Sequence, residues 1–193
     1  TESGFTGNLG GISGADAKCM ADKQAMGKGT FKAMISDGVN RTATPQAKDW
    51  VLKPITPYSN TNGGLIGITT SDSVFSFDLT SIFGTNQSLM YGTYAWTGIS
   101  GGWISSWFNC NQWTYGGSFD GNNSTQGLLG LNTSLTELSI DSGILSACDM
   151  SSWSFGTIIT IGMRITLRLI KRRKRMGLFD MFKKKAEIGR AHV

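Results

Sequence analysis

Short runs of alternating apolar and polar residues recur along the chain and predict strands. Apolar residues occupy alternate positions of SVFSFDL, residues 73–79, and the same period is present in TFKAMIS, residues 30–36. Two more short strands are expected near residues 94–98 and 127–131. Turn sequences rich in Gly and Asn, such as GNLGG, NTNGG and DGNN, separate these segments.

One helix is signalled near the start of the chain. The sequence Ser13-Gly-Ala-Asp16 has the form of a capping box, with Ser13 as the N-cap and Asp16 reaching back to it. Ala15, Cys19 and Met26 then fall on one face, and the glycines at 27 and 29 end the helix. One helix followed by many short strands and long loops predicts an α+β domain.

Charge divides the chain into two parts. Residues 1–160 carry seven Lys or Arg and eleven Asp or Glu, a net charge of −4. Residues 161–193 carry eleven basic and two acidic residues, a net charge of +9, which accounts for the overall +5. An interpretation as a nucleic-acid or membrane-surface protein therefore rests on the C-terminal segment alone.

This C-terminal segment has three interpretations. The run KRRKR at 171–175, followed by MGLFDMFKKK, is typical of an arm that binds phosphates or anionic lipid. The second interpretation is a solvated, disordered tail. In the third, the tail is not native: IGRAHV at 188–193 matches one translated frame of a common sequencing adapter before its stop codon. We expect residues 157–193 to be a non-native or disordered basic tail and residues 1–156 to form the domain.

Neither a membrane span nor a signal peptide is recognised in the chain. No stretch reaches the roughly 18 consecutive apolar residues that a spanning helix needs. The chain opens on Thr1, inside a turn-rich stretch, so we interpret Thr1 as a cut end that an upstream signal or anchor could precede.

The distribution of reactive side chains argues against an enzyme. The only histidine is His192, which leaves the rest of the chain without a Ser–His or Cys–His pair. Three widely spaced cysteines make a weak case for zinc, and we expect no metal or other cofactor. The carboxylates are scattered, and convergence of Asp78, Asp120 and Asp141 into an acid–base pair stays open. Oxygen ligands in DGNNS, residues 120–124, allow calcium as a minor alternative to an Asx-rich turn.

The most distinctive stretch is AWTGISGGWISSWFNCNQWTYGG, residues 95–117. We expect Trp96 and Trp113 to pack in the core, whereas Trp103 and Trp107 lie among Gly and Ser, where a loop is expected. Rigid aromatic side chains flanked by small polar residues make contact surfaces of low entropy cost. A binding role is therefore predicted for Trp103, Trp107, Asn109, Asn111 and Tyr115. The alternative, in which most of these residues fill a loop-rich core, stays open.

Several segments resemble a bacterial endostatin-like family of unknown function. The match begins with FTGNLGGISGADAKCMADKQAMGKGTFKAMISDGVNR, residues 5–41, and continues with VFSFDL, AWTGIS, NCNQW and SAC in the same order. It covers roughly residues 5–153. Members occur in surface proteins and lipoproteins, including spirochaete outer-membrane proteins, and resemble the collagen-derived endostatin domain.

The resemblance implies a C-type-lectin-like fold with one or two helices, a curved antiparallel sheet and long loops. It also implies two nested disulfides, of which the inner one maps onto Cys110 and Cys148. The outer one would join Cys19 to a cysteine in a final strand, but no cysteine follows Cys148. We therefore expect Cys19 to stay outside any disulfide and the final strand to be missing or replaced. Closing the inner loop would stabilise the fold by roughly 3–4 kcal/mol and would argue for an oxidising compartment.

Two functions follow as hypotheses. The first is a non-catalytic, adhesion-type module on a bacterial surface protein, outer-membrane or secreted, that binds an extracellular protein or glycan and no specific nucleic acid. The second is cationic binding to a membrane surface or nucleic acid through residues 164–185. In the first hypothesis, replacing Trp103 or Trp107 by Ala abolishes binding and leaves the melting temperature nearly unchanged.

Overall fold

The computed structural model describes residues 4–21, 29–60, 63–83, 94–131 and 133–150, together with the backbone of 157–158 and 160–162. These residues belong to one compact unit, Thr1–Met163. The basic segment at 164–193 lies outside the described residues. The elements are α1 (Gly11–Ala21), β1 (Phe31–Ala33), β2 (Pro57–Ser59), β3 (Leu65–Ile68), β4 (Tyr94–Trp96), β5 (Ile99–Ser100), η1 (Gly101–Trp103), β6 (Ile104–Ser105), α2 (Cys110–Trp113), η2 (Asn123–Thr125), β7 (Gln126–Leu131), η3 (Glu137–Ser139), β8 (Ile144–Ala147), β9 (Thr157–Ile158) and β10 (Thr160–Gly162).

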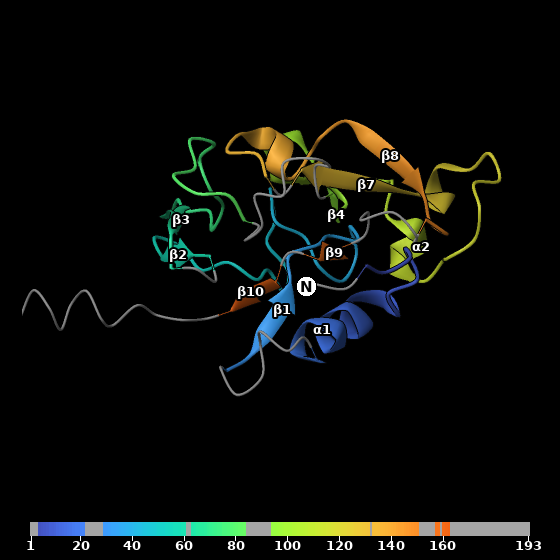
Figure 1. Cartoon of the computed structure of the whole chain (residues 1–193), viewed down its shortest axis with the longest axis horizontal. Helices are drawn as coiled ribbons and strands as arrows, with labels where there is room; N and C mark the ends of the chain where they lie inside the picture. Colours follow the sequence, from blue (N-terminus) through green and yellow to red (C-terminus); the bar gives the residue numbers. More distant parts are fainter. Residues whose placement is uncertain are drawn as a thin grey trace, which may run out of the picture. The chain divides into compact units, whose positions relative to one another are not determined.

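The largest sheet has the strand order β8-β7-β4-β9 (Figure 1). Strand β7 runs antiparallel to both β8 and β4, whereas β9 runs parallel to β4. Strand β10 pairs antiparallel with β1, which lies beside α1 (Figure 1). The domain boundary predicted between residues 156 and 157 stays a prediction. Strands β9 and β10, which follow residue 156, pair with β4 and β1.

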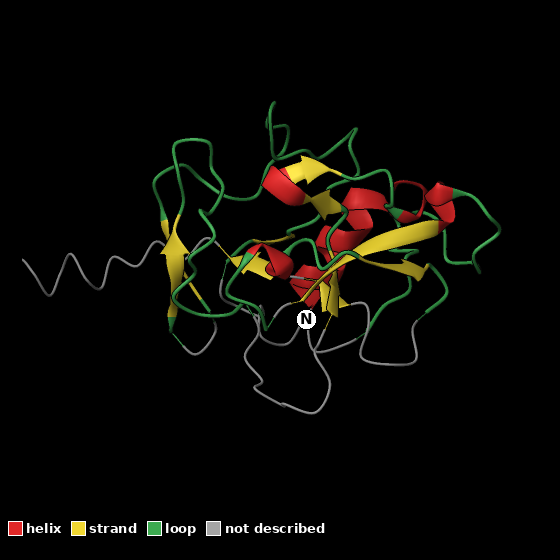
Figure 2. Ribbon diagram, turned by 90° about the horizontal axis from the view of Figure 1, so that it is seen from above, coloured by secondary structure: helices red, strands yellow, loops and turns green. Residues whose placement is uncertain are grey.

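The remaining pairs, β2–β3 and β5–β6, are small antiparallel hairpins. Loops connect most of these short elements (Figure 2). Few helices and small, mainly antiparallel sheets confirm the predicted α+β class. Strands β4 and β7 confirm the strands expected near residues 94–98 and 127–131.

Two hydrophobic clusters fill the described part of the chain. The first contains Met34, Ala43, Val51, Leu52, Tyr58, Ile66, Val74, Phe75, Leu79, Ala95, Ile99, Trp103 and Ile140. The second contains Leu9, Ala15, Cys19, Ala33, Ile35, Trp96, Cys110, Trp113, Leu129 and Cys148. Neighbouring residues alternate between the clusters, because successive side chains of an extended segment point to opposite sides.

This alternation explains why residues 30–36 are buried on both sides. Ala33 and Ile35 belong to the second cluster, and Met34 between them belongs to the first. The alternation predicted from the sequence is therefore present, but both sides of the segment are buried. Only Phe31–Ala33 is a strand, and it pairs with β10.

Two expectations about individual elements are wrong: the N-cap of the first helix and the strand at residues 73–79. Helix α1 begins at Gly11, and the N–H of Gly14 already donates to the carbonyl of Gly10 (3.1 Å), so Ser13 lies inside the helix and is not its N-cap. Met26 and Gly27 lie outside the described residues. Residues 73–79 form a single bridge, between Thr69 and Phe75, and not a strand. The chain turns at Ser73, whose φ is 63°, and then buries two consecutive apolar side chains instead of alternate ones.

A fully buried arginine joins α1, β1 and the loop that follows β1. Arg41 has no exposed side-chain surface, and its guanidinium donates to both carboxylate oxygens of Asp16 (2.8 Å each). It also donates to Asp49 and to the carbonyl of Ala33 (2.8 Å). Asp16 is therefore not a capping residue, because its carboxylate binds Arg41 and the N–H of Ala33 (2.9 Å).

The predicted disulfide between Cys110 and Cys148 is confirmed, with a Cα–Cα distance of 5.8 Å. Trp96 and Trp113 pack around it in the second cluster, as expected, with ring centroids 6.0 Å apart. Gly7 lies so close that an added Cβ would fall 2.2 Å from Sγ of Cys110. A side chain at position 7 would therefore displace the disulfide. Cys19 is a buried thiol in the same cluster.

We predict that Arg41→Met destabilises the protein by roughly 2–4 kcal/mol, because two carboxylates lose the charge that neutralises them. This loss of stability is modest for a buried ion pair because water still reaches both carboxylates: Asp16 and Asp49 keep 23% and 42% of their side-chain surface exposed. Denaturant unfolding measures the change. Lys53→Met, at an exposed lysine, is the control and should shift the free energy of unfolding by less than about 0.5 kcal/mol. Equal effects of the two substitutions would contradict the structural role of Arg41.

Candidate binding surface

Trp107 presents the most exposed large apolar side chain among the described residues, at 86%. Its neighbours in the chain face inward: Ser106 and Asn109 are buried, and Phe108 is half-buried. An indole in water loses the apolar burial that stabilises most tryptophans. Because Trp is enriched among the residues that dominate binding energy at protein interfaces, an exposed Trp is a candidate contact residue.

Backbone hydrogen bonds hold the segment around Trp107 on both sides. The N–H of Ser106 donates to the carbonyl of Gly98 (2.8 Å), and the carbonyl of Phe108 accepts from the N–H of Leu128 in β7 (2.9 Å). Asn109 forms an isolated bridge with Gly127, also in β7. The indole of Trp107 is thus presented by a backbone attached to the central sheet.

The turn that follows has an unusual backbone. All four residues of α2 have positive φ, between 50° and 64°, so α2 is a left-handed turn and not an ordinary second helix. For L-residues this conformation costs roughly 1–2 kcal/mol each. The disulfide at Cys110 and the hydrogen bond from Nε1 of Trp113 to the carbonyl of Ser36 (2.9 Å) hold the turn at both ends.

The loop after β1 supports the same segment. Hydroxyl oxygens of Ser36 and Ser105 lie 2.7 Å apart, and Nδ2 of Asn109 donates to the carbonyl of Asp37 (3.1 Å). The carboxylate of Asp37 accepts the N–H groups of Val39 and Arg41 (3.0 and 2.9 Å). Burial alone would raise the pKa of Asp37, but these bonds and those from Asn40 outweigh it and lower the pKa.

Two further apolar side chains are exposed on these contacting segments. Val39 lies in the loop held by Asp37, and Ile104 precedes Ser105 in β6; both are about half exposed. We call Val39, Ile104 and Trp107 together the Trp107 surface. Sequence reasoning missed Val39 and Ile104, because nothing in their local sequence distinguishes an exposed apolar residue from a core one.

The structure corrects the expectation for Trp103. Its side chain is 3% exposed and belongs to the first cluster. Nε1 donates to the carbonyl of Phe75 (3.0 Å), and the ring stacks on Phe77 with centroids 5.4 Å apart. Trp50 packs edge-on at 6.0 Å. A ligand at the surface cannot contact this indole, so Trp103 is a core residue.

The other predicted contacts divide between structural and exposed positions. Asn109 is 8% exposed, and its amide is used internally: Nδ2 donates to two carbonyls and Oδ1 accepts the N–H of Gln112 (2.9 Å). Tyr115 is half-buried against the second cluster and donates to the carbonyl of Ser118 (3.0 Å). Asn111 is exposed. A binding role stays a prediction for Trp107, Asn111 and Tyr115.

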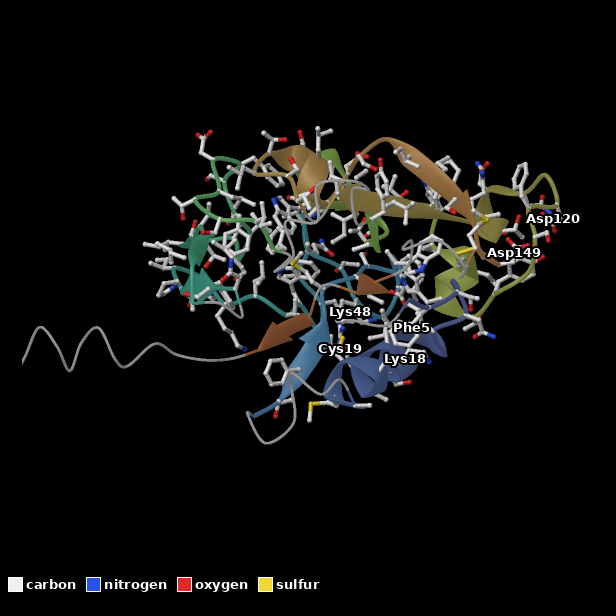
Figure 3. All side chains as sticks on the ribbon, viewed as in Figure 1. Phe5, Lys18, Cys19, Lys48, Asp120 and Asp149 are labelled. Atoms are coloured by element: carbon white, nitrogen blue, oxygen red, sulfur yellow. A yellow bond between two sulfur atoms is a disulfide. The ribbon has the colours of Figure 1, made fainter. Side chains whose placement is uncertain are left out.

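The loop considered for calcium forms an Asx turn. One oxygen of Asp120 accepts from the N–H of Asn122 (3.0 Å) and the hydroxyl of Thr125 (2.7 Å). These bonds, that from Thr125 first, lower the pKa of Asp120. Figure 3 places Asp120 and Asp149 at the same end of the domain. Within the described residues, no group of three His, Cys, Asp or Glu could hold a metal ion.

Helix α1 carries a contact between a lysine and an aromatic ring. Nζ of Lys18 lies 5.6 Å from the ring centroid of Phe5 and donates to the carbonyl of Leu9 (3.1 Å; Figure 3). This cation–π contact holds the first described residues against α1. Its atoms are engaged within the domain, and we assign it no binding role.

Comparison with protein families identifies a family of unknown function. The model of a family described as "Protein of unknown function (DUF1554)" matches residues 2–135, more than two thirds of the chain. The matched part includes Arg41 and the whole Trp107 surface. None of the curated proteins matches the chain. No helix in the described residues is long and apolar enough to cross a membrane.

Two tryptophans of one segment provide a matched pair. We predict that Trp103→Ala lowers the free energy of unfolding by roughly 3–5 kcal/mol, since it leaves a cavity among aromatic rings. Trp107→Ala should change it by less than about 0.5 kcal/mol, because the indole is in water. Urea unfolding of both variants checks the difference. Equal destabilisation would mean that Trp107 is packed in solution.

Acid should destabilise the protein partly through Asp37. Its pKa in the folded protein lies below the ordinary value of 3.8, so its stabilising contribution is complete above pH about 4 and is lost as the pH falls through the folded-state pKa. We predict a smaller acid-induced loss in Asp37→Asn than in the parent, measured by urea unfolding between pH 7 and 2.5. Asp72→Asn, at an exposed aspartate, is the control. An unchanged pH profile in Asp37→Asn would show that Asp37 does not contribute.

Proposed function

This chain belongs to the DUF1554 family of proteins of unknown function, and on that premise we propose that it is a non-catalytic, adhesion-type binding domain of a bacterial surface protein. Exposure of Trp107 on a fixed backbone carries the proposal. Interface energy is concentrated in a few buried anchors, among which Trp is enriched. A residue whose backbone is already held in place loses little backbone entropy when a partner covers it.

The proposed scaffold is endostatin-like and C-type-lectin-like. One N-terminal helix, an antiparallel core of β8, β7 and β4, long loops and the Cys110–Cys148 disulfide support it. The left-handed turn at α2 departs from an ordinary second helix. Fold likeness says nothing of the ligand, so the function is argued from the Trp107 surface.

The proposed location is the cell surface or the outside of the cell. A disulfide persists where glutathione and thioredoxin do not reduce it, as in periplasmic, outer-membrane and secreted proteins. The Cys110–Cys148 bridge closes a sequence separation of 38 residues within the second cluster. A buried disulfide of this kind supports folding in an oxidising compartment.

We favour a protein ligand over a glycan. Val39 and Ile104 are exposed apolar residues on segments joined to that of Trp107 by hydrogen bonds, and we propose that they extend its contact with an apolar protein patch. A sugar-binding site needs several polar groups directed at hydroxyls. The amide of Asn109 at this position is engaged internally.

No feature of the described residues favours catalysis or cationic binding as a second function. The only histidine, His192, and the basic residues 164–185 lie outside the described residues. The proposal therefore concerns the body of the domain alone.

We predict that Trp107→Ala reduces binding to an extracellular-matrix protein partner at least tenfold, while Trp107→Phe retains part of it. The probes are immobilised fibronectin, laminin and collagen, with a glycan array in parallel, and surface plasmon resonance measures the affinity. Ile55→Ala, at an exposed isoleucine outside the Trp107 surface, is the control and should bind as the parent does. Binding that is unchanged in Trp107→Ala, or that occurs on the glycan array alone, contradicts the proposal.

A further inference from the structure

Strand β8 lies at one end of the four-stranded sheet, and no described strand pairs with its outer side. It pairs with β7 from Gln126–Ala147 to Leu129–Ile144. An edge strand presents a row of backbone N–H and C=O groups to whatever lies beside it.

The register identifies which groups of β8 face outward. In β7, the N–H of Leu128 donates to Phe108 and its carbonyl accepts from Thr97, so both groups point away from β8. When two residues lie directly opposite each other in an antiparallel pair, the backbone N–H and C=O groups of both point either toward the partner strand or away from it. Leu145, the partner of Leu128, therefore directs its N–H and C=O to the outer side of the sheet.

The sequence of β8 does not protect this edge. Natural edge strands carry lysine, proline or a bulge that prevents a further strand from pairing. Strand β8 reads Ile-Leu-Ser-Ala, has no charge and no proline, and is exposed at Ile144 and partly exposed along the rest. Its register with β7 is continuous over four pairs.

Acidic residues lie beyond both ends of the strand. Asp141 precedes β8 and accepts the N–H of Gly101 (2.9 Å), and Glu137 nearby accepts the N–H of Gly102 (2.7 Å). Asp149 follows β8, is exposed, and accepts from the hydroxyl of Ser118. These bonds place negative charge at each end of an uncharged strand. The first 160 residues are acidic as a whole, with a net charge of −4.

We propose that β8 is a docking edge for an extended peptide of a partner protein, which adds a fifth strand to the sheet and carries basic residues on both sides of a short uncharged core. Main-chain hydrogen bonds to Leu145 supply the pairing, and the carboxylates at 141 and 149 select the flanking charges. This site does not include the Trp107 surface, so it goes beyond the function proposed above.

The same charges disfavour a second copy of this chain as the occupant. In a two-fold antiparallel pair centred on Leu145, Asp141 of one copy would lie opposite Asp149 of the other, and symmetry would repeat the contact. Like charges directly opposite destabilise a strand pair. A peptide with basic ends replaces both repulsions by attractions.

The test uses the full chain and three acetylated, amidated seven-residue peptides. The first is Lys-Thr-Val-Thr-Val-Thr-Lys, the second has Glu at both ends, and the third has the first sequence with its three central backbone nitrogens methylated. Isothermal titration at 150 mM salt measures binding. We expect binding of the first peptide and at least fivefold weaker binding of the other two, because one loses the charge match and the other loses its donors.

Leu145 allows a matched pair of variants. Because its N–H faces outward, Leu145→Pro removes a donor from the edge without removing a hydrogen bond to β7. We expect at least fivefold weaker binding of the first peptide to Leu145→Pro than to Leu145→Ala, which keeps the N–H. Asp149→Asn should also weaken binding, and near-ultraviolet circular dichroism verifies folding.

Three outcomes would overturn the proposal. The first is no binding of the first peptide at millimolar concentration. The second is equal binding of the methylated peptide, which requires no variant and so holds even if Leu145→Pro fails to fold. The third is self-association of the parent that Leu145→Pro abolishes, which would assign the edge to a second copy.

Discussion

The guanidinium of Arg41 is buried without any exposed side-chain atom, and a charge in that position has to be neutralised and hydrogen-bonded by whatever surrounds it. Asp16 on α1, the carbonyl of Ala33 in β1 and Asp49 on the following loop meet this requirement. Hydrophobic packing joins α1 and β1 in the second cluster, and the buried cation adds a link from both of them to the loop. Their relative placement depends on satisfying one cation, and the loop that supports Trp107 begins within this network.

Interactions on either side restrain the backbone of the Trp107 surface. Upstream, Asp37 orders the loop through its backbone, and downstream the disulfide at Cys110 holds a left-handed turn that is unfavourable by itself. Loops usually move more than the elements they connect. Here the exposed indole is presented by a segment that the sheet, a carboxylate and a covalent bond restrain, which is the condition for a preorganised contact.

Sequence reasoning found the features that depend on local pattern or on family resemblance. Helix α1, strands β4 and β7 and the Cys110–Cys148 bridge agree with expectation, and so do the buried Trp96 and Trp113. It failed where tertiary contacts decide: the pattern in SVFSFDL suits a strand, yet Phe75 and Phe77 are used to enclose Trp103. Composition could not separate Trp103 from Trp107, because both lie among Gly and Ser and only the packed rings differ. Arg41 gave no signal, since a buried arginine and an exposed one look alike in sequence.

The segments whose side chains alternate between the two hydrophobic clusters limit how related sequences can diverge. Met34 and Ile35 are adjacent yet belong to different clusters. The same is true of Ala95 and Trp96 in β4. Replacing one of these side chains disturbs one cluster, whereas inserting or deleting a single residue would exchange the two sides and expose both clusters to the wrong side chains. Relatives should therefore vary in residue type along these two segments but keep their length, so that alignment gaps fall in the connecting loops.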